Sequence, residues 1–500
     1  MRSDKLQDAI GMVDEELIVA ADKKPNILFK FRWVAVVAAM LVIAIGIGVV
    51  TLPDVPMTGE VDNTTATTTR GTTSGTVQTT TQSTTQTTTQ STTIKVELPT
   101  ALSSHAISEA VYPTMAKYPQ VDGYNYDSEK YELWQADRKK QSAYKNAVGN
   151  LDEFYKKTIP EFLIDNKNEN RVYSPLNMYM ALSMLAEINN NKGRDKLLDF
   201  LQVDSIQSLR TQAHGIWNAN YCDDGAVTSI LGSSLWLRDG VSYNKEVINN
   251  LTKYYYASSY SGKMGSTEYN NMLKNWLNKQ TGGLLQDQVE DTELSEETIM
   301  ALLTTVYFTA KWDKVFYDDR ITQKLFHTPS GDEFCEFMHE TNNTGRIYWG
   351  EKFSSTTKGL KEGGEVVFIL PDENVSVNEL LKDEETLSFI SSKDTWDNQK
   401  GITVNLSVPK FDIQSNYDII KGMKNLGLAD CLGMVSSASH SSRVVADKEG
   451  VVATSFIPIY FPLSAPPLKD KIDFVLDRPF IFVINSSVGM PLFVGVVNNP

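Results

Sequence analysis

Residues 447–480 are the most informative segment of the chain, and this segment opens with Asp447-Lys448-Glu449-Gly450-Val451-Val452-Ala453-Thr454-Ser455. It continues as an apolar run interrupted by prolines, Phe456-Ile457-Pro458-Ile459-Tyr460-Phe461-Pro462-Leu463-Ser464-Ala465-Pro466-Pro467. The small and β-branched residues at 451–455 suit a strand, whereas the prolines resist a central strand because they donate no ladder hydrogen bond. Composition leaves two interpretations open: a buried strand followed by a proline-rich connection, or a long segment displayed for a partner to attack.

The charge of the chain argues against nucleic-acid binding, because a net charge of −15 is repelled by a phosphate backbone. Cys222, Cys335 and Cys431 are odd in number, far apart and without metal-ligand spacing, so they predict buried or half-buried thiols rather than a disulfide framework. Stability must therefore come from a hydrophobic core, which the 41% of hydrophobic residues can supply.

Catalytic signatures are missing from the sequence. The five histidines, at positions 105, 214, 327, 339 and 440, belong to no zinc-protease motif, and the chain has no nucleophile elbow, phosphate-binding loop or dinucleotide fingerprint. We therefore expect a protein that is not an enzyme and that needs neither a metal nor another cofactor.

An uncharged run from Trp33 to Pro53 lies near the N-terminus. As a helix it would be roughly 30 Å long and would cross the hydrocarbon core of a bilayer, so residues 33–53 predict a single transmembrane helix. A cleaved signal peptide is the alternative. The 32 residues that precede the run are long for a signal peptide, and no small-x-small cleavage site follows, which favours the uncleaved anchor.

Charges around this run predict the organisation of the chain. Basic residues precede it and acidic residues follow it, which places residues 1–32 in the cytoplasm as a short segment and the C-terminal body outside the cell. Residues 54–95 are so rich in Thr, Ser and Gln that they predict a disordered extracellular stalk. Residues 96–147 then form an extension of the globular body, and residues 148–500 its main domain.

Strand patterns become more frequent toward the C-terminus, after helical patterns early in the body. In residues 402–408, Ile402, Val404, Leu406 and Val408 alternate with polar residues, as in a strand with one buried face. Helices early and strands late predict a mixed α+β domain.

Several blocks of the chain, in family order, resemble the serpins, a family of serine protease inhibitors. They are Asn170-Arg171-Val172-Tyr173-Ser174-Pro175, Trp276-Leu277-Asn278-Lys279-Gln280-Thr281-Gly282-Gly283, Thr305-Val306-Tyr307-Phe308-Thr309-Ala310-Lys311-Trp312, Val408-Pro409-Lys410-Phe411-Asp412-Ile413 with Leu426-Gly427-Leu428, Asp477-Arg478-Pro479-Phe480-Ile481-Phe482-Val483-Ile484 and Pro491-Leu492-Phe493-Val494-Gly495-Val496-Val497-Asn498-Asn499-Pro500. The resemblance, in particular to membrane-anchored bacterial serpins, implies a serpin-like α+β fold with a large central β-sheet, further sheets, surrounding helices and an exposed reactive-centre loop.

The resemblance also implies a mechanism. A protease cleaves the loop and forms an acyl-enzyme, and the cut loop inserts into the main sheet as a new strand, which traps the protease before deacylation. The hinge at which insertion starts falls on Glu449, Gly450, Val451, Val452, Ala453, Thr454 and Ser455. Lys448 stands where the family usually has an acidic residue. Phe456 and Pro458 also depart from the family pattern, because Pro458 cannot donate a hydrogen bond in a strand that is paired on both sides.

Two alignments of the loop give two candidate scissile bonds. Family spacing from the hinge places the bond at Ser464–Ala465, whereas alignment of the downstream residues 464–467 places it at Leu463–Ser464. The second is favoured because it presents an apolar side chain to the primary pocket of the protease. Either bond suits an elastase- or chymotrypsin-like serine protease, with a cysteine protease as a further candidate partner, and neither suits a trypsin-like enzyme.

Five further residues match family positions that control opening of the sheet. Ser174, Asn177, Thr304 and His440 fall at the "shutter" positions beneath the sheet, and Trp312 falls at its top, the "breach" where insertion begins. Asn177 and Thr304 replace the more usual Ser and Asn. Without the resemblance, His440 in its serine-rich stretch would be interpreted as a solvent-facing residue and Trp312 as an ordinary core residue.

Two functions follow as hypotheses. The first is a monomeric serine-type endopeptidase inhibitor, held at the cell membrane by a single-pass anchor with its C-terminal domain outside, which acts as a suicide substrate. The second is a non-inhibitory serpin-fold module for binding or adhesion at the cell surface, which Phe456 and Pro458 favour.

Overall fold

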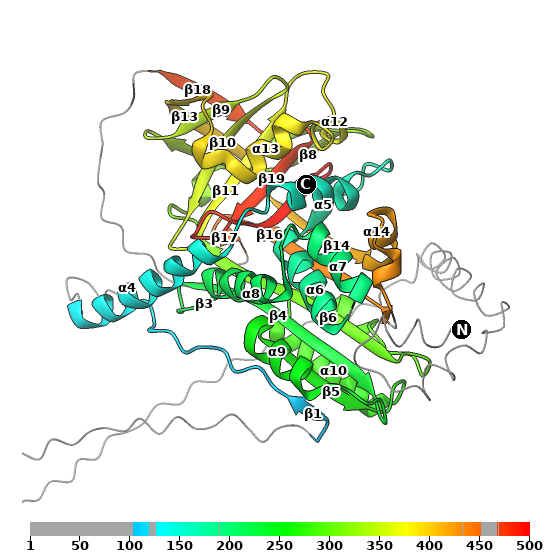
Figure 1. Ribbon diagram of the computed structural model, residues 1–500. Helices are drawn as coiled ribbons and strands as arrows, with labels where there is room; N and C mark the ends of the chain where they lie inside the picture. Colours follow the sequence, from blue (N-terminus) through cyan, green and yellow to red (C-terminus); the bar gives the residue numbers. More distant parts are fainter. Residues whose placement is uncertain (1–103, 120–126, 190, 434, 452–467, 469) are drawn as a thin grey trace, which may run out of the picture. The chain divides into compact units, whose positions relative to one another are not determined.

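Three β-sheets with surrounding helices make up the part of the chain that the structure, a computed structural model, describes: residues 104–119, 127–189, 191–433, 435–451, 468 and 470–500 (Figure 1). The expected membrane run at 33–53, the stalk at 54–95 and loop residues 452–467 lie outside these ranges. Within them, no helix combines the length and the apolar character that a membrane span requires. The α+β architecture expected from the sequence is confirmed.

The main sheet has nine strands, and its central part contains the candidate site described below. Its order is β1 (Ala106–Ser108), β5 (Ala257–Gly262), β4 (Val227–Arg238), β6 (Met300–Lys311), β17 (Gly450–Val451), β16 (Ser439–Ala446) and β14 (Phe411–Asp418), with β3 (Cys222–Asp223) beside β4 and β15 (Val435–Ser437) beside β6. Strand β6 is buried along most of its length, as expected for a strand covered on both faces.

The other two sheets contain most of the C-terminal sequence blocks. A seven-stranded sheet has the order β12 (Gln399–Gly401), β9 (Arg346–Trp349), β10 (Phe353–Leu360), β11 (Gly364–Pro371), β19 (Phe480–Asn485), β20 (Pro491–Val497) and β2 (Arg171–Tyr173). A four-stranded sheet has the order β18 (Lys471–Val475), β13 (Thr403–Pro409), β8 (Gly331–Asn342) and β7 (Ile321–Thr328). The strand expected at 402–408 is confirmed as β13, in which Val404, Leu406 and Val408 are buried.

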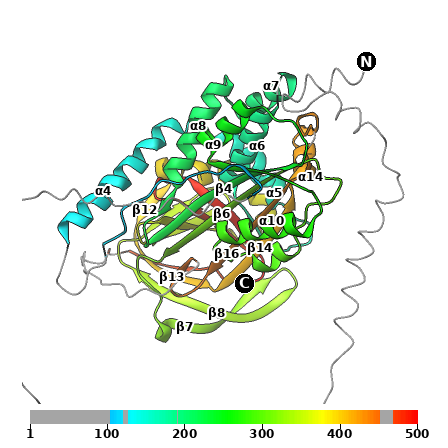
Figure 2. The same ribbon diagram turned by 90° about the horizontal axis from the view of Figure 1, so that it is seen from below.

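Eleven α-helices surround the three sheets in the described residues. They are α4 (Ser128–Ala143), α5 (Asp152–Leu163), α6 (Pro175–Ile188), α7 (Asn191–Phe200), α8 (Ile206–Asn220), α9 (Lys245–Tyr255), α10 (Thr267–Gln280), α11 (Gln286–Glu290), α12 (Val377–Leu380), α13 (Glu384–Ser392) and α14 (Ile419–Asn425), joined by short 3₁₀ turns that include η2 (Tyr144–Ala147) and η4 (Lys393–Thr395). Figure 2 shows α8 and α9 on one side of strands β4 and β6 and α10 on the other.

Helix α6 occupies the centre of the larger core. Every one of its residues is buried, and it packs against β6 and β20. The sequence determines its start, because the Ser174 side chain accepts a hydrogen bond from the Asn177 amide and Pro175 fills the first helical position. On the opposite face, α10 packs Leu273 and Trp276 against Trp236 and Leu303 of the sheet in a second core. The predicted thiols are confirmed: Cys222 and Cys431 are buried and Cys335 is half-buried.

We expect Gly364→Ala to destabilise the fold much more than Gly240→Ala. Both glycines have positive φ, +106° and +80°, so each alanine is strained by about 1–2 kcal/mol. Only at Gly364 would the new Cβ also lie 2.0 Å from the backbone oxygen of Asn485, whereas Gly240 has open space. Overpacking adds about 1–3 kcal/mol. Equal losses of unfolding free energy in urea titrations of the two variants would contradict the steric argument.

Candidate functional site

The predicted hinge, residues 449–455, starts within a tight turn of four residues, Asp447–Gly450, called the hinge turn below. Its conformation is set by Asp447, whose Oδ1 accepts the amide hydrogens of Glu449 (2.8 Å) and Gly450 (3.1 Å). The Asp447 amide in turn donates to the Gly450 carbonyl at 3.1 Å. An aspartate that bonds the backbone two residues on is a standard turn former. The hinge turn therefore reverses the chain after β16, so that Gly450 and Val451 run back into the main sheet.

Gly450 and Val451 form β17, which lies between β6 and β16. Gly450 pairs with Lys311 and Val451 with Ala310 on β6, and Val451 pairs with Ala446 on β16, antiparallel in each case. A Cβ atom on Gly450 would lie 2.4 Å from the Ala310 oxygen and 2.7 Å from the Lys311 Cα. Glycine is required here because the two backbones approach too closely for any side chain. The sequence signal for the hinge thus has a steric basis.

Trp312 fixes the hinge turn to the end of β6. Its indole N–H donates to the Asp447 carbonyl (2.7 Å) and its backbone N–H to the Glu449 carbonyl (3.1 Å), while the Phe316 amide donates to the Lys448 carbonyl (2.9 Å). Trp312 is only 2% exposed. The interpretation of Trp312 as a plain core residue therefore misses its two hydrogen bonds to the hinge turn.

A buried cation lies against the aromatic ring of Trp312. The ammonium group of Lys358 on β10 lies 5.4 Å from the ring centre of Trp312 and 4.5 Å from that of Phe316. Glu340 bonds this ammonium group directly, and Asp313 lies 3.8 Å from it. Lys358 is 3% exposed, so the ion pair and the aromatic faces replace the water that the cation has lost.

Lys448 has a partner that explains its unexpected charge. Its ammonium group lies 2.6 Å from Asp318 Oδ1, in the short turn after Trp312. The hydrogen bond with Asp318 raises the pKa of Lys448. The acidic group that the family usually has at position 448 is thus supplied here by Asp318 in the turn. The Lys448–Asp318 pair is exposed, so solvent screens it.

The predicted shutter residue His440 is fully buried beneath the sheet. Its Nε2 accepts the Ser174 amide hydrogen at 3.1 Å, the Ser442 hydroxyl lies 2.9 Å from the same nitrogen, and the Asn177 side-chain amide lies 3.1 Å from Nδ1. We call Ser174, Asn177, His440 and Ser442 the His440 cluster. Tyr417 stacks on the imidazole ring and Tyr173 meets it edge-on, with ring centres 6.2 Å and 5.7 Å away.

These contacts assign the protonation state of the ring. Burial lowers the pKa of His440 to about 4, so the ring is neutral at pH 7. Because Nε2 is the acceptor of the Ser174 amide, the ring proton resides on Nδ1. Turning over the Asn177 amide, whose Oδ1 otherwise has no partner, gives this proton an acceptor.

Thr304 joins the site through its backbone. It stands opposite His440 where β6 and β16 pair directly with each other, in parallel orientation. Its hydroxyl group is buried and makes no hydrogen bond among the described residues, so its side chain stays outside the polar network that the resemblance implied. Strands β6 and β16 are therefore closed at the level of Thr304 and His440.

The hinge and the His440 cluster lie at two points along the same strand pair. Six residues beyond Thr304 and His440, Ala310 and Ala446 pair with Val451 instead of with each other. At strand spacing, six residues correspond to about 20 Å. The structure thus places Glu449, Gly450, Val451 and Trp312 at the open end of the pair, and Ser174, Asn177, Thr304 and His440 at the closed end. Val452, Ala453, Thr454, Ser455, Leu463, Ser464 and Ala465 lie outside the described residues.

Sequence reasoning missed several residues of the site, among them Ser442, Asp318 and Lys358. Ser442 follows His440 by two residues on a strand, and this period of two was an available signal that both side chains share a face. Asp318 and Lys358 come from other segments, and their approach to Lys448 and Trp312 depends on pairings that no local pattern predicts.

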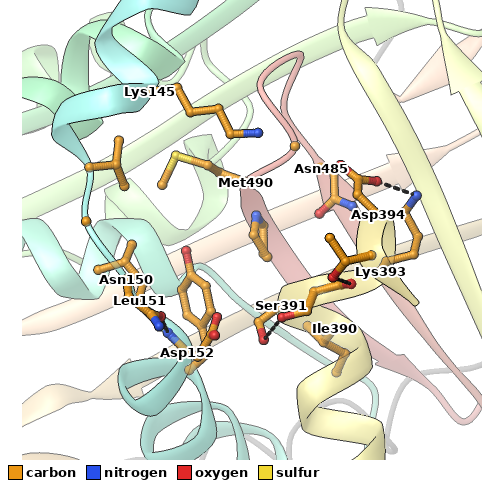
Figure 3. A pocket seen from close by; sticks show the side chains of 17 residues that line it. Lys145, Asn150, Leu151, Asp152, Ile390, Ser391, Lys393, Asp394, Asn485 and Met490 are labelled. Atoms are coloured by element: carbon orange, nitrogen blue, oxygen red, sulfur yellow. Dashed lines mark hydrogen bonds and ion pairs between the residues drawn. The ribbon is translucent and has the colours of Figure 1, made fainter. Parts of the chain in front are cut away.

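A cavity of about 410 Å³ lies apart from the hinge, between the start of α5, the end of α13 with η4, and the turn before β20 (Figure 3). Two cations, Lys145 and Lys393, line it, and Lys393 is bonded to Glu365 at 2.8 Å and Asp394 at 2.9 Å. Burial alone would lower the pKa of Lys393, but the two carboxylates outweigh it and raise the pKa. The described residues hold no cluster of three potential metal-ligating His, Cys, Asp or Glu side chains, here or elsewhere.

Comparisons with known proteins agree with this geometry. Residues 150–500 match the family described as serpin (serine protease inhibitor), and the chain belongs to this family. Alpha-1-antiproteinase 2 of Equus caballus is 24% identical over 375 residues, which cover 70% of this chain and 86% of the relative. The thermophilic serpin tengpin in its native state has a TM-score of 0.60 at 23% identity, over 77% of this chain and 97% of tengpin. Arabidopsis AtSerpin1 in its native stressed conformation has a TM-score of 0.58 at 22% identity, over 73% and 98% of the two chains.

Replacement of Gly450 by alanine is expected to detach β17. The clash with Ala310 and Lys311 leaves no room for Cβ, and overpacking of this kind costs about 1–3 kcal/mol. Hydrogen exchange should accelerate at the amides of Trp312 and Phe316, which donate to the hinge turn. Gly401→Ala is the matched control, because its Cβ would meet only Leu468 at 3.7 Å. Unchanged exchange at Trp312 in Gly450→Ala would refute the steric role.

Burial of neutral His440 predicts a pH dependence of stability. The folded pKa of about 4 lies below the ordinary value of 6.5, so the unfolded state binds the proton first as the pH falls. The contribution of His440 to the free energy of unfolding is complete above about pH 6.5. It falls toward pH 4 by about 1.4 kcal/mol per pH unit. Between pH 6.5 and 5 the wild type should lose about 2 kcal/mol more unfolding free energy than His440→Gln. Parallel curves would contradict the prediction.

Proposed function

We propose that this chain is a serine-type endopeptidase inhibitor that acts as a suicide substrate. One observation carries the proposal: β6 and β16 pair directly at Thr304 and His440, yet admit Gly450 and Val451 between them at the opposite end. A sheet in this state has room for one more strand, and the chain segment that would fill it is already aligned at its open end. Relatives named as protease inhibitors, such as plasma serine protease inhibitor of Mus musculus, support the same function.

The pairing geometry supplies the driving force for insertion. β17 is antiparallel to both of its neighbours, so residues that follow Val451 would continue antiparallel between them. Insertion replaces one parallel ladder between β6 and β16 by two antiparallel ladders, which adds backbone hydrogen bonds and the more stable of the two pairing modes. In the intact chain the loop is held at both ends, since β18 continues from it into the four-stranded sheet. Cleavage near Leu463 removes this restraint.

The loop sequence directs the proposal to a class of protease. Cleavage at Leu463–Ser464, or at Ser464–Ala465, suits an elastase- or chymotrypsin-like serine protease, with a cysteine protease as a further target. The acyl-enzyme formed at the new carboxyl end is carried along with the inserting strand. Inhibition then depends on insertion being faster than deacylation.

Location is part of the proposal. The uncharged run at 33–53 would anchor a monomer in a cell membrane, with residues 1–32 in the cytoplasm. The Thr-, Ser- and Gln-rich residues 54–95 would hold the extension at 96–147 and the inhibitor domain at 148–500 outside the cell. An anchored inhibitor of this kind suits a bacterial surface exposed to foreign proteases.

A non-inhibitory module for binding or adhesion is the alternative. Phe456 and Pro458 favour it, because a proline in a strand paired on both sides leaves one carbonyl without its hydrogen bond, at a cost of about 1–3 kcal/mol. The cavity beside Lys393 is the place where such a module would hold a small ligand.

Incubation of the full-length protein with pancreatic elastase, or with chymotrypsin, tests the inhibitor function. We expect a covalent complex that survives denaturing electrophoresis, and a large rise in the melting temperature of the cleaved protein. Thr454→Arg, which places a charge in the inserting segment, should give cleavage without complex. Cleaved wild-type protein with an unchanged melting temperature and no complex would refute inhibition and favour the binding module.

A further inference from the structure

The residues ahead of the family match make an unusual set of contacts with the body. The match starts at residue 150, whereas β1 already pairs with the edge strand β5, with Ala106 opposite Tyr260 and Ser108 opposite Ser259. Four residues beyond β1, the ring of Tyr112 lies 5.1 Å from that of Trp217 on α8, and its hydroxyl donates to Gln280 at the end of α10 at 3.0 Å. The extension is therefore attached to the half of the sheet that contains β4, β5 and β6.

Helix α4 continues the extension toward the hinge end of the sheet; Figure 1 shows it beside α8 and β3. The indole N–H of its buried Trp134 donates to Asp224 Oδ2 at 2.8 Å. Asp224 is fully buried in the turn between β3 and β4, where its other oxygen accepts the amides of Ala226 and Val227. The Tyr118 amide donates to the Asp224 carbonyl at 2.7 Å. The extension thus holds the β3–β4 turn from two sides.

Arg138 connects this turn to a different sheet. One of its guanidinium nitrogens lies 2.8 Å from Gln141 Oε1 and 3.2 Å from the Cys222 sulfur on β3, and the other donates to the Glu362 carbonyl. Glu362 belongs to the turn between β10 and β11 of the seven-stranded sheet. That turn lies on the end of β6, because the Lys361 amide donates to the Lys311 carbonyl at 2.8 Å and Leu360 bridges Trp312.

Lys311 and Trp312 hold the hinge: Lys311 pairs with Gly450, and the Trp312 amide donates to the Glu449 carbonyl. In the proposed insertion β6 separates from β16 together with β4, to which it is paired, whereas the turn that holds Glu362 belongs to the seven-stranded sheet. Arg138 contacts both parts, so any shift between them must break its bond to Cys222 or to Glu362. A guanidinium bond to a carbonyl is charge-assisted and therefore stronger than a neutral bond.

We propose that Arg138 and Trp134 of α4 are positioning residues that brace the hinge end of the main sheet and so set the rate at which the loop inserts. The inference rests on the proposed function for its consequence, but the brace itself is a property of the intact protein. An extension outside the family domain would then set the rate of loop insertion in this inhibitor.

Hydrogen exchange on the intact full-length protein tests the brace. In Arg138→Ala we expect exchange at the amides of Trp312 and Lys361 to accelerate at least tenfold, which corresponds to about 1.4 kcal/mol. Trp134→Phe, which keeps an aromatic ring but removes the indole donor, should act in the same direction. Lys139→Ala is the matched control, since this exposed neighbour on α4 undergoes the same charge change. Exchange in β13, remote from α4, serves as the internal reference.

The outcomes separate the brace from general stability and from the proposed function. Unchanged exchange at Trp312 and Lys361 in Arg138→Ala overturns the brace, and so does equal acceleration in β13, which indicates a merely structural role. As a second readout, the rise in melting temperature after cleavage by elastase should develop faster in Arg138→Ala than in Lys139→Ala. Should wild-type protein show no rise after cleavage, the inhibitor mechanism fails, while the exchange result still decides whether Arg138 braces the sheet.

Discussion

In the main sheet, β6 and β16 pair with each other along only part of their length, and the arrangement of the site residues follows from this constraint. At the level of Thr304 and His440 they are hydrogen-bonded neighbours, and about 20 Å farther on the backbone of Val451 lies between them. Different side chains stabilise the two ends of this strand pair. The His440 cluster joins β16 to the start of α6, and Trp312 fastens the hinge turn to the end of β6. Opening the sheet would separate β6 from β16 first at the hinge, where Trp312 holds, and then at the His440 cluster.

In the proposed insertion, the polar groups of the site would oppose the separation of β6 from β16. His440 is neutral and fully buried, and its hydrogen bonds to Ser174, Asn177 and Ser442 cannot be replaced by water without admitting solvent to the core. Lys358 beneath Trp312 is a buried cation that depends on Glu340 and two aromatic faces. Breaking a buried polar contact is more costly than breaking an exposed one, since the partner left behind remains desolvated. The barrier to opening is therefore concentrated in a few residues.

Much of this fold could be predicted from the sequence, because the informative residues are local. The alternation at 402–408 predicted β13, and Ser174-Pro175 predicted the start of α6. Family spacing brought His440, Ser174 and Asn177 to one place, which the structure reproduces. The Lys448–Asp318 pair, the support of Trp312 by Lys358 and the bridge made by Arg138 were not predicted. Each joins segments that are distant in the chain, and only the three-dimensional pairing of strands brings those side chains together.

The way the chain joins the body has a mechanical consequence. Any pull transmitted through the residues before 104 enters at β1, a three-residue strand with an irregular register at the outer edge of the sheet. Such a strand peels away under a smaller load than the long pairing of β4 with β6 withstands. The aromatic contacts of Tyr112 would resist next, and tension that released them would reach α4 last. Force on the chain would therefore break these contacts one after another before it reached the pairing of β4 with β6.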